Sequence, residues 1–188
     1  MQEKNLFIRT VLGSLPFVAV SVVLLGFVFV AIQQVYRAGA NDPQIQIAED
    51  TAGKLSAGAD LSTIIPVGII PIESSLGSYV IVYNSVGYAL GGNGSLHGSV
   101  PVLPEGVLEF ARQNGGHQLT WQPEEGVRQA IVLVPYKSAS SAGFVMVGRS
   151  LMETEEQIMD LTLMLWLALV LSLVSAFIAV FLREWLAN

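Results

Sequence analysis

The fold class of this chain is decided by residues 11–32, VLGSLPFVAVSVVLLGFVFVAI, which contain no charged side chain. Residues 161–182, LTLMLWLALVLSLVSAFIAVFL, form a second uncharged stretch of the same length. At about 1.5 Å per residue, each helix would rise roughly 33 Å, enough to cross a hydrocarbon core of about 30 Å. We therefore predict two transmembrane helices, over residues 11–37 and 159–183. Pro16 is expected in the first turn of the first helix, where a proline costs little.

A cleaved signal peptide is the alternative for the first stretch, because Ala38-Gly39-Ala40 offers an A-x-A cleavage pattern. The apolar run is much longer than the roughly 7–15 residues of a signal-peptide core. Gln33, Gln34, Tyr36 and Arg37 also separate the run from the cleavage pattern. We therefore favour a retained anchor.

The basic residues at the two ends of the chain predict its orientation in the membrane. Lys4 and Arg9 precede the first span, and Arg183 follows the second. The positive-inside rule then makes residues 1–10 and 184–188 cytoplasmic tails. We expect a bacterial inner (cytoplasmic) membrane location with both termini in the cytoplasm.

Residues 38–158 are predicted to form a periplasmic, or extracytoplasmic, domain between the spans. Residues 38–160 hold thirteen acidic and five basic residues, a net charge of −8 in a chain whose net charge is −6. This acidity disfavours nucleic acid and a polybasic lipid-binding patch, and a solvated acidic surface explains it. The chain has no cysteine, which excludes disulfides and thiolate chemistry.

The first element of this domain is predicted to be an amphipathic helix of about fourteen residues that ends near Gly58. Asn41-Asp42-Pro43 provides its start, because Asp42 can cap the helix and proline suits the first helical position. Its apolar stripe consists of Ile45, Ala48, Ala52 and Leu55.

Five strands follow from alternating or apolar β-branched and aromatic patterns. They are residues 78–83, 88–90, 117–122, 126–136 and 142–149. Asn84–Gly87 is the predicted turn of the first hairpin, and Gly91–Gly94 is predicted to be a flexible loop after it. Strand 126–136 is the longest and is apolar on both faces over Ile131–Val134, which indicates a central strand. Residues 59–77 are apolar and broken by prolines, and receive no assignment beyond contact with the core or the membrane surface.

Two further helices complete the pattern. Pro104-Glu105-Gly106 opens a short helix, which Asn114-Gly115-Gly116 ends. Ser150-Leu-Met-Glu153 matches a capping box, with Ser150 as the cap and Glu153 reaching back. Because neither proline nor glycine follows, one helix is predicted from about Leu151 to Leu186, roughly 50 Å long.

The order helix, hairpin, helix, three strands and exit helix resembles the PAS/Cache-type extracytoplasmic sensor region of bacterial sensor histidine kinases, over Asn41 to Glu156. The similar motifs are Ala40-Asn-Asp-Pro-Gln-Ile-Gln-Ile-Ala-Glu-Asp50, Pro104-Glu-Gly-Val-Leu108, Thr120-Trp-Gln-Pro123, Gly126-Val-Arg128 and Gly148-Arg-Ser-Leu151. The resemblance implies an α+β fold in which a five-stranded antiparallel sheet carries its flanking helices on one face. It also implies an input module inserted between two transmembrane helices.

The same resemblance limits the expected activity. A kinase would continue after Arg183 with a HAMP-like linker, a phosphoacceptor helix and an ATP-binding domain, whereas the sequence stops at Asn188. We therefore expect the input module without the kinase output half.

Six residues are candidates for a ligand or interface site, because PAS-like folds hold small ligands between the sheet and its loops. An arginine with aromatic neighbours can hold a carboxylate there. The alternative is that the arginines make structural ion pairs and the aromatic residues fill the core. The candidates are Arg128, Arg149, Trp121, Tyr79, Tyr83 and Tyr136.

Other motifs offer no chemistry that we would assign. His97 and His117 lack metal-ligand spacing, and the adjacent carboxylates read as solvated surface. No G-x-S-x-G elbow is present, and Gly91–Gly94 lacks the lysine and hydroxyl of a phosphate-binding loop. We expect no catalytic residue, no metal and no cofactor, and hence not an enzyme.

Two functions remain open from the sequence. The first is a membrane-anchored, non-catalytic PAS-like sensor or adaptor that binds a small molecule or protein outside and acts through partner proteins. The second is a structural accessory subunit of a larger bacterial membrane protein complex. Small residues in both spans permit close packing with other integral membrane proteins. They are Gly13, Ser14, Ala19, Gly26 and Ala31 in the first span, and Ala168, Ser172, Ser175, Ala176 and Ala179 in the second.

Overall fold

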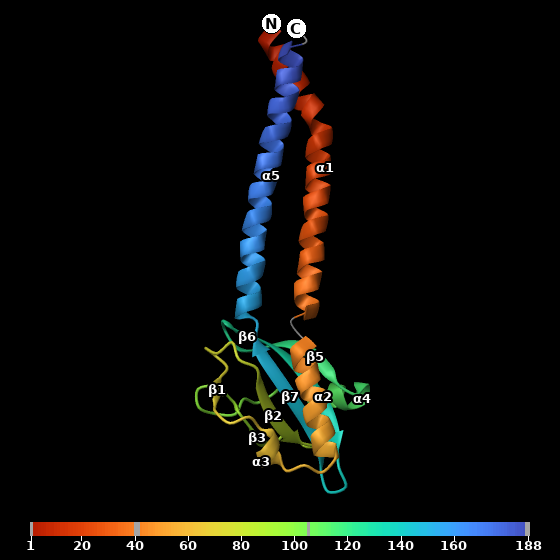
Figure 1. The fold of residues 1–188 in the computed structure, drawn as a ribbon, viewed down its shortest axis with the longest axis vertical. Coiled ribbons are helices and arrows are strands. Elements are labelled where there is room, and N and C mark those ends of the chain that lie inside the picture. The colour runs from red at the N-terminus through yellow and green to blue at the C-terminus, as the bar shows by residue number, and fades with distance from the viewer. Residues whose placement is uncertain (1, 40–41, 105, 187–188) are drawn as a thin grey trace. The chain divides into compact units, whose positions relative to one another are not determined.

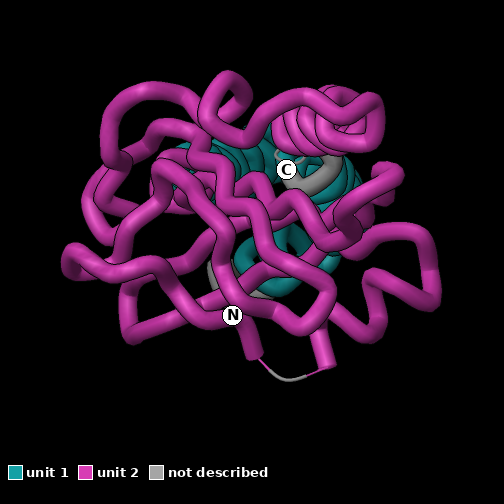
Figure 2. The backbone as a smooth tube through the Cα atoms, turned by 90° about the horizontal axis from the view of Figure 1, so that it is seen from below, with its two compact units in different colours: residues 1–36, 156–188 teal, residues 37–155 magenta. Residues whose placement is uncertain are grey.

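The structure is a computed structural model that describes residues 2–39, 42–104 and 106–186. The chain forms two compact units, residues 37–155 and a second unit of residues 1–36 with 156–188 (Figure 2). The first unit is an α+β domain, and the second is a pair of apolar helices. The predicted α+β domain between two long apolar helices is thereby confirmed.

The two long helices are α1 (Gln2–Gly39) and α5 (Met152–Leu186) (Figure 1). Their apolar parts, Leu6–Tyr36 and Met152–Leu186, have mean hydropathies of 2.8 and 2.7 in their most apolar windows. Most of their large apolar side chains are exposed. By length and composition, these are the two helices of the described chain that could span a membrane.

Pro16 lies in the interior of α1, so the expectation that it occupies the first turn is wrong. The helix begins at Gln2, well before the first apolar span, because residues 2–10 continue the helical pattern. A proline inside a helix removes one backbone hydrogen bond and bends the axis. In Figure 1 the N-terminal part of α1 is inclined to the rest of that helix.

The domain is built on a five-stranded antiparallel sheet with the strand order β3-β2-β7-β6-β5. The strands are β2 (Tyr79–Asn84), β3 (Ala89–Gly92), β5 (His117–Glu124), β6 (Val127–Lys137) and β7 (Ala142–Ser150). The antiparallel five-stranded sheet is confirmed. The predicted interior place of β6 is confirmed, since β6 pairs with β7 on one side and with β5 on the other, and β7 occupies the middle of the five strands.

Short elements fill the segments that the sequence left open. They are α3 (Leu61–Ile64), β1 (Ile70–Pro71) and β4 (Gly94–Ser95), and β1 pairs with β4 in parallel. The predicted flexible loop at residues 91–94 is wrong, because Gly91 and Gly92 end β3 and Gly94 begins β4. Asn93 anchors this segment: its side-chain Oδ1 accepts a hydrogen bond from the Val80 N–H at 2.7 Å.

One face of the sheet is covered by α2 (Asp42–Ser56), which confirms the predicted amphipathic helix. Ala48, Ala52 and Leu55 are buried there against valines of three strands, namely Val80, Val82, Val132, Val145 and Val147. Each fully buried valine or leucine contributes roughly 1.5–3 kcal/mol relative to its exposed state. The predicted start at residues 41–43 is not tested, because Asn41 and the Asp42 side chain lie outside the described parts.

The opposite face is covered by α4 (Val107–Asn114) and by loops. Ala111 of α4 and Ile72 pack there against larger side chains, namely Tyr79, Ile81, Tyr83, Trp121, Ile131, Leu133, Phe144 and Met146. The expectation of helices on one face is therefore wrong. The physical reason is the strand alternation, which places apolar side chains on both faces of β2, β6 and β7, so that both faces need a cover.

Candidate functional site

The four aromatic candidates lie inside the domain core and on two different faces of the sheet. Tyr79, Tyr83 and Trp121 belong to the core on the α4 side, whereas Tyr136 belongs to the core under α2. All four are at most 5% exposed. The structure therefore does not bring these four rings together around one cavity.

The two tyrosine hydroxyls on the α4 side have different environments. Tyr83 donates a hydrogen bond to the Pro101 carbonyl oxygen at 3.0 Å. The hydroxyl of Tyr79 is buried and has no partner within the described part of the chain. Burial raises the pKa of both hydroxyls above the ordinary value of 10.0, and the neighbouring Tyr83 adds to the shift at Tyr79. Both tyrosines are neutral near pH 7.

Glycines create the space that Tyr79 fills. A Cβ atom at Gly148 would overlap the far end of the Tyr79 ring, and one at Gly94 would overlap its near side. Gly148 is the direct cross-strand neighbour of Tyr79 in the β2–β7 pair. The ring therefore lies across the central strand, where it packs as a core side chain.

The two arginine candidates lie at the end of the sheet that leads into α5. The register pairs Ala130 with Arg149, so alternation puts Arg128 and Arg149 on the same face as diagonal neighbours. Arg149 donates a hydrogen bond to the carboxylate of Glu153 at 2.6 Å, and its Nε donates to the Leu76 carbonyl at 3.3 Å. Arg128 forms an ion pair with Glu155.

These four charged side chains form one group, which we call the junction cluster: Arg128, Arg149, Glu153 and Glu155. The backbone adds a further connection, since the Leu151 N–H donates to the Arg128 carbonyl at 2.9 Å. Negative charge in the first turn of a helix is favoured by the helix dipole. The cluster therefore fixes the start of α5 to two neighbouring strands of the sheet.

The predicted capping box at the start of α5 forms only in part. The Ser150 hydroxyl accepts a hydrogen bond from the Met152 N–H at 3.2 Å, so Ser150 does cap the helix. Glu153 bonds to Arg149 and not to the Ser150 backbone. The physical reason is the guanidinium, which offers the carboxylate a charge-assisted hydrogen bond that a neutral N–H cannot match.

A histidine–glutamate cluster was missed by the sequence reasoning. His97 Nε2 lies 2.9 Å and 3.1 Å from the two carboxylate oxygens of Glu124, and its Nδ1 lies 3.9 Å from Glu73. The hydrogen bond to Glu124, together with the negative charges of Glu124 and Glu73, raises the pKa of His97 above 6.5. The three residues are far apart in the sequence, so no spacing rule identifies them.

The His97 cluster does not have the arrangement of a metal site. No group of three or more His, Cys, Asp or Glu side chains in the described ranges is placed to hold a metal ion. The two ring nitrogens of His97 point to different carboxylates. The exposed His97 imidazole can bind a proton and then form ion pairs with the Glu124 and Glu73 carboxylates.

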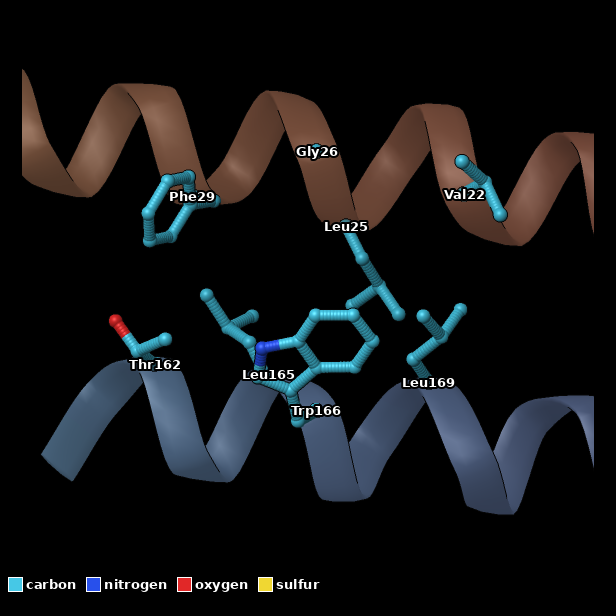
Figure 3. Close-up of a pocket in the computed structure, with 8 residues that line it drawn as sticks. All are labelled: Val22, Leu25, Gly26, Phe29, Thr162, Leu165, Trp166 and Leu169. Carbon is cyan, nitrogen blue, oxygen red and sulfur yellow. The ribbon is translucent and has the colours of Figure 1, made fainter. Parts of the chain in front are cut away.

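A separate cavity of about 290 Å³ lies between α1 and α5 (Figure 3). Its lining is almost wholly apolar, and its one hydroxyl, that of Thr162, donates to the Ile158 carbonyl of its own helix at 2.7 Å. The side chains of Leu25, Leu165 and Trp166 project into the space between the two helices (Figure 3). The cavity therefore offers apolar packing and no reactive group.

The two helices make specific contacts elsewhere along their length. The hydroxyls of Ser21 and Ser172 are hydrogen-bonded at 2.7 Å, and Phe7 meets Phe177 edge to face. A Cβ atom at Gly13 would approach Val180 to 2.9 Å, so α1 and α5 are in close contact there. A second cavity, of about 680 Å³, is lined by residues of both helices, among them Phe17 of α1 and Arg183 of α5.

No protein-family model matches this chain, and a comparison with curated proteins finds no significant match. The function is therefore argued from the fold and from the contacts of the described residues.

Proposed function

We propose that the chain is a membrane-anchored, non-catalytic PAS/Cache-like sensor or adaptor module of the bacterial inner membrane. Its α+β domain then lies on the periplasmic side, both termini are cytoplasmic, and its output passes through partner proteins. The long apolar helices α1 and α5 and the basic residues Arg9 and Arg183 support this topology.

The observation that carries the proposal is the junction cluster. Arg128 and Arg149 lie on neighbouring strands, β6 and β7, and each pairs with a glutamate near the start of α5. The helix then continues without interruption from Met152 to Leu186. A displacement of these strands therefore acts directly on the first turn of a helix that is long enough to cross a membrane.

The energies in the cluster suit a response to small forces. Each exposed ion pair contributes roughly 0.2–1 kcal/mol, so both can rearrange at a cost that ligand or protein binding can supply. A rigid structural connection would instead be expected to use buried apolar contacts, which cost more to rearrange. The weak, exposed ion pairs at this junction therefore favour a sensor or adaptor over a purely structural role.

The topology is tested with single cysteines, which the natural chain lacks. Ser140→Cys lies in an exposed turn of the domain, and Leu186→Cys lies at the exposed end of α5. In intact cells with a permeabilised outer membrane, we expect an impermeant maleimide to label position 140 and not position 186. Labelling of both positions, or of position 186 alone, would contradict the topology.

The coupling is tested by amide hydrogen exchange on the full chain in nanodiscs. We expect Arg128→Gln together with Arg149→Gln to lower protection of the first turn of α5, at residues 152–156. Lys54→Gln, on the exposed face of α2, is the control and should leave this turn unchanged. Unchanged protection in the double variant would remove the support for a sensor.

The second candidate function is an accessory subunit of a larger membrane complex. The small residues of both spans and the cavities between α1 and α5 favour it, because they leave room for other helices. Purification in a mild detergent distinguishes the two functions. A stoichiometric complex that resists dilution supports the subunit, whereas recovery without other proteins contradicts it.

A further inference from the structure

Charge is distributed very unevenly along the domain. Residues 61–104 contain one acidic residue, Glu73, and neither lysine nor arginine. The other twelve of the thirteen acidic residues between positions 38 and 160, and all five basic ones, lie outside this segment. The net negative charge therefore comes from residues 38–60 and 105–160, whereas the part that residues 61–104 build is nearly uncharged.

This charge-poor segment forms one side of the fold. It contains α3, β1, β2, β3 and β4, and β3 is the edge strand opposite β5. Ile65 lies against Gly91, since a Cβ atom at Gly91 would approach the Ile65 side chain to 2.8 Å. The Ile70 N–H donates to the Asn93 carbonyl at 2.6 Å. Residues 65–71 therefore run beside residues 91–95, and β1 and β4 pair there in parallel.

Large aliphatic side chains are exposed along these two neighbouring segments. Val67 is 104% exposed, Ile69 79% and Leu90 50%. We call these three residues the edge patch. Single exposed aliphatic residues are ordinary on a protein surface, but a group of them without charged neighbours marks an interaction surface.

The strand beneath the patch is β3, a four-residue edge strand whose pairing with β2 is irregular between Val82 and Tyr83. Shortness and such an irregularity protect a sheet edge against extended pairing, as do lysine, proline, inward charges or a covering segment, so the patch offers side-chain contacts and not a long strand for pairing. Residues Ala89 to Gly92 carry no charge and no proline. Residues 65–71 cover the Gly91 end of the strand, and within the described chain no strand pairs with the outer side of Ala89 and Leu90.

We propose that the edge patch is the docking surface for a second copy of this chain, with two domains meeting around a two-fold axis. Two identical copies, each with a net charge of −8 over residues 38–160, repel one another across their acidic parts. The charge-poor side is where two copies can approach without opposing like charges. A two-fold interface uses the same patch on both copies, and an uncharged patch meets this condition with itself.

A lipid surface fits the edge patch less well than a second copy does. Interfacial segments combine apolar residues with lysine or arginine and are anchored by tryptophan or phenylalanine. Residues 61–104 contain none of these four residue types. The proposal goes beyond the proposed function, because it rests on the charge and exposure of the domain alone.

Cysteine cross-linking of the full chain in native membranes tests the proposal directly. The chain has no natural cysteine, so each variant carries one thiol. Val67→Cys and Ile69→Cys place it in the edge patch, and Gln46→Cys places it on the exposed face of α2 as the matched control. Because a disulfide requires Cα atoms within about 7 Å, we expect a covalent dimer from a patch variant and none from the control.

A charge substitution supplies the second test. Val67 is fully exposed, so Val67→Asp leaves the domain folded and opposes two carboxylates across the interface. In nanodiscs, we expect this variant to raise the dimer dissociation constant at least about tenfold, whereas Gln46→Asp leaves it unchanged. Near-UV circular dichroism of both variants verifies the fold.

Several outcomes would overturn the proposal. One is a wild-type chain that is monomeric at the highest concentrations tested. Another is a dimer that Val67→Asp leaves intact, which would place its interface elsewhere, for example between the apolar helices. A cross-link from position 67 to a different protein would replace the second copy with another partner. Protection of a spin label at position 67 by lipid would identify a membrane-facing surface instead.

Discussion

The guanidinium of Arg149, near the end of β7, donates a hydrogen bond to the carboxylate of Glu153, near the start of α5, across 2.6 Å. Arg149 also donates to the Leu76 carbonyl, which belongs to the segment before β2. One side chain thus links the central strand, a loop and a helix. This is the kind of structural ion pair that the sequence analysis gave as the alternative to a ligand site at Arg149.

The Arg149–Glu153 pair should be measurable by a double-mutant cycle of Arg149→Gln and Glu153→Gln. Both side chains are more than one third exposed, so we expect a coupling energy of roughly 0.2–1 kcal/mol. In 1 M salt, where the Debye length is about 3 Å, the coupling should approach zero. Urea unfolding in detergent, followed by Trp121 fluorescence in a Trp166→Phe/Trp185→Phe background, provides the measurement. A salt-independent coupling would contradict this account.

The two buried tyrosines should respond differently to loss of their hydroxyls. Tyr83→Phe leaves the Pro101 carbonyl without its donor and should lower the free energy of unfolding by about 0.5–1.5 kcal/mol. Tyr79→Phe removes a buried hydroxyl that has no partner in the described structure, and should be neutral or stabilising. The same urea assay compares them. Equal losses in both variants would show that Tyr79 has a partner.

Gly148 and Gly53 form a second matched pair. A methyl group at Gly148 would overlap the Tyr79 ring, and relief of such overlap requires backbone or side-chain shifts that cost about 1–3 kcal/mol. Gly53 lies in α2 with no atom near its would-be Cβ, so Gly53→Ala should stabilise the helix by roughly 0.5–1 kcal/mol. Opposite shifts of the urea midpoint are expected. A stabilising Gly148→Ala would contradict the packing of Tyr79 across β7.

The hydrogen bond between Ser21 and Ser172 predicts a coupling between α1 and α5. In bicelles, a double-mutant cycle of Ser21→Ala and Ser172→Ala should give about 0.6 kcal/mol, the mean for such bonds between membrane helices. Ser175 is the control, because its hydroxyl donates to the Leu171 carbonyl within α5. We expect no coupling between Ser21→Ala and Ser175→Ala. Such a coupling would indicate a different pairing of the two helices.

The elements of this fold were predictable where a local pattern decides them. The stripe of Ala48, Ala52 and Leu55 identifies α2 because helical periodicity is a short-range property. The alternating and apolar residues of β2, β6 and β7 identify strands for the same reason. The position of β7 at the centre was not predictable, because strand order depends on pairing between distant segments.

The candidate site shows a similar limit. Arg128 and Arg149 were chosen from the sequence and do lie on one face of neighbouring strands, but their partners, Glu155 and Glu153, were read as surface and cap. The His97–Glu124 contact joins residues 27 positions apart, and the hairpins that bring them together follow from the whole fold. Glu73 approaches His97 from a third segment. Sequence spacing carries information on neither of these two His97 contacts.

The His97 cluster predicts that the stability of the domain depends on pH in the neutral range. The hydrogen bond and charge of Glu124, with the charge of Glu73, raise the pKa of His97 above the ordinary value of 6.5. A histidine whose pKa is raised by folding binds its proton more tightly in the native state. Its contribution is therefore fully present below pH 6.5 and is lost as the pH rises through the raised value.

We expect the urea midpoint of the full chain to fall between pH 6 and pH 8, and this fall to disappear in His97→Gln. The chain has one other histidine, His117, whose ring lies tilted against Phe110 at a centroid distance of 4.3 Å and pairs with no carboxylate in the described structure. His117→Gln is therefore the matched control and should keep the pH dependence. Glu124→Gln removes the largest cause of the raised pKa and should shrink the fall, because Glu73 alone then acts from 3.9 Å. A pH dependence that follows His117, or that survives in His97→Gln, would show that another group carries it.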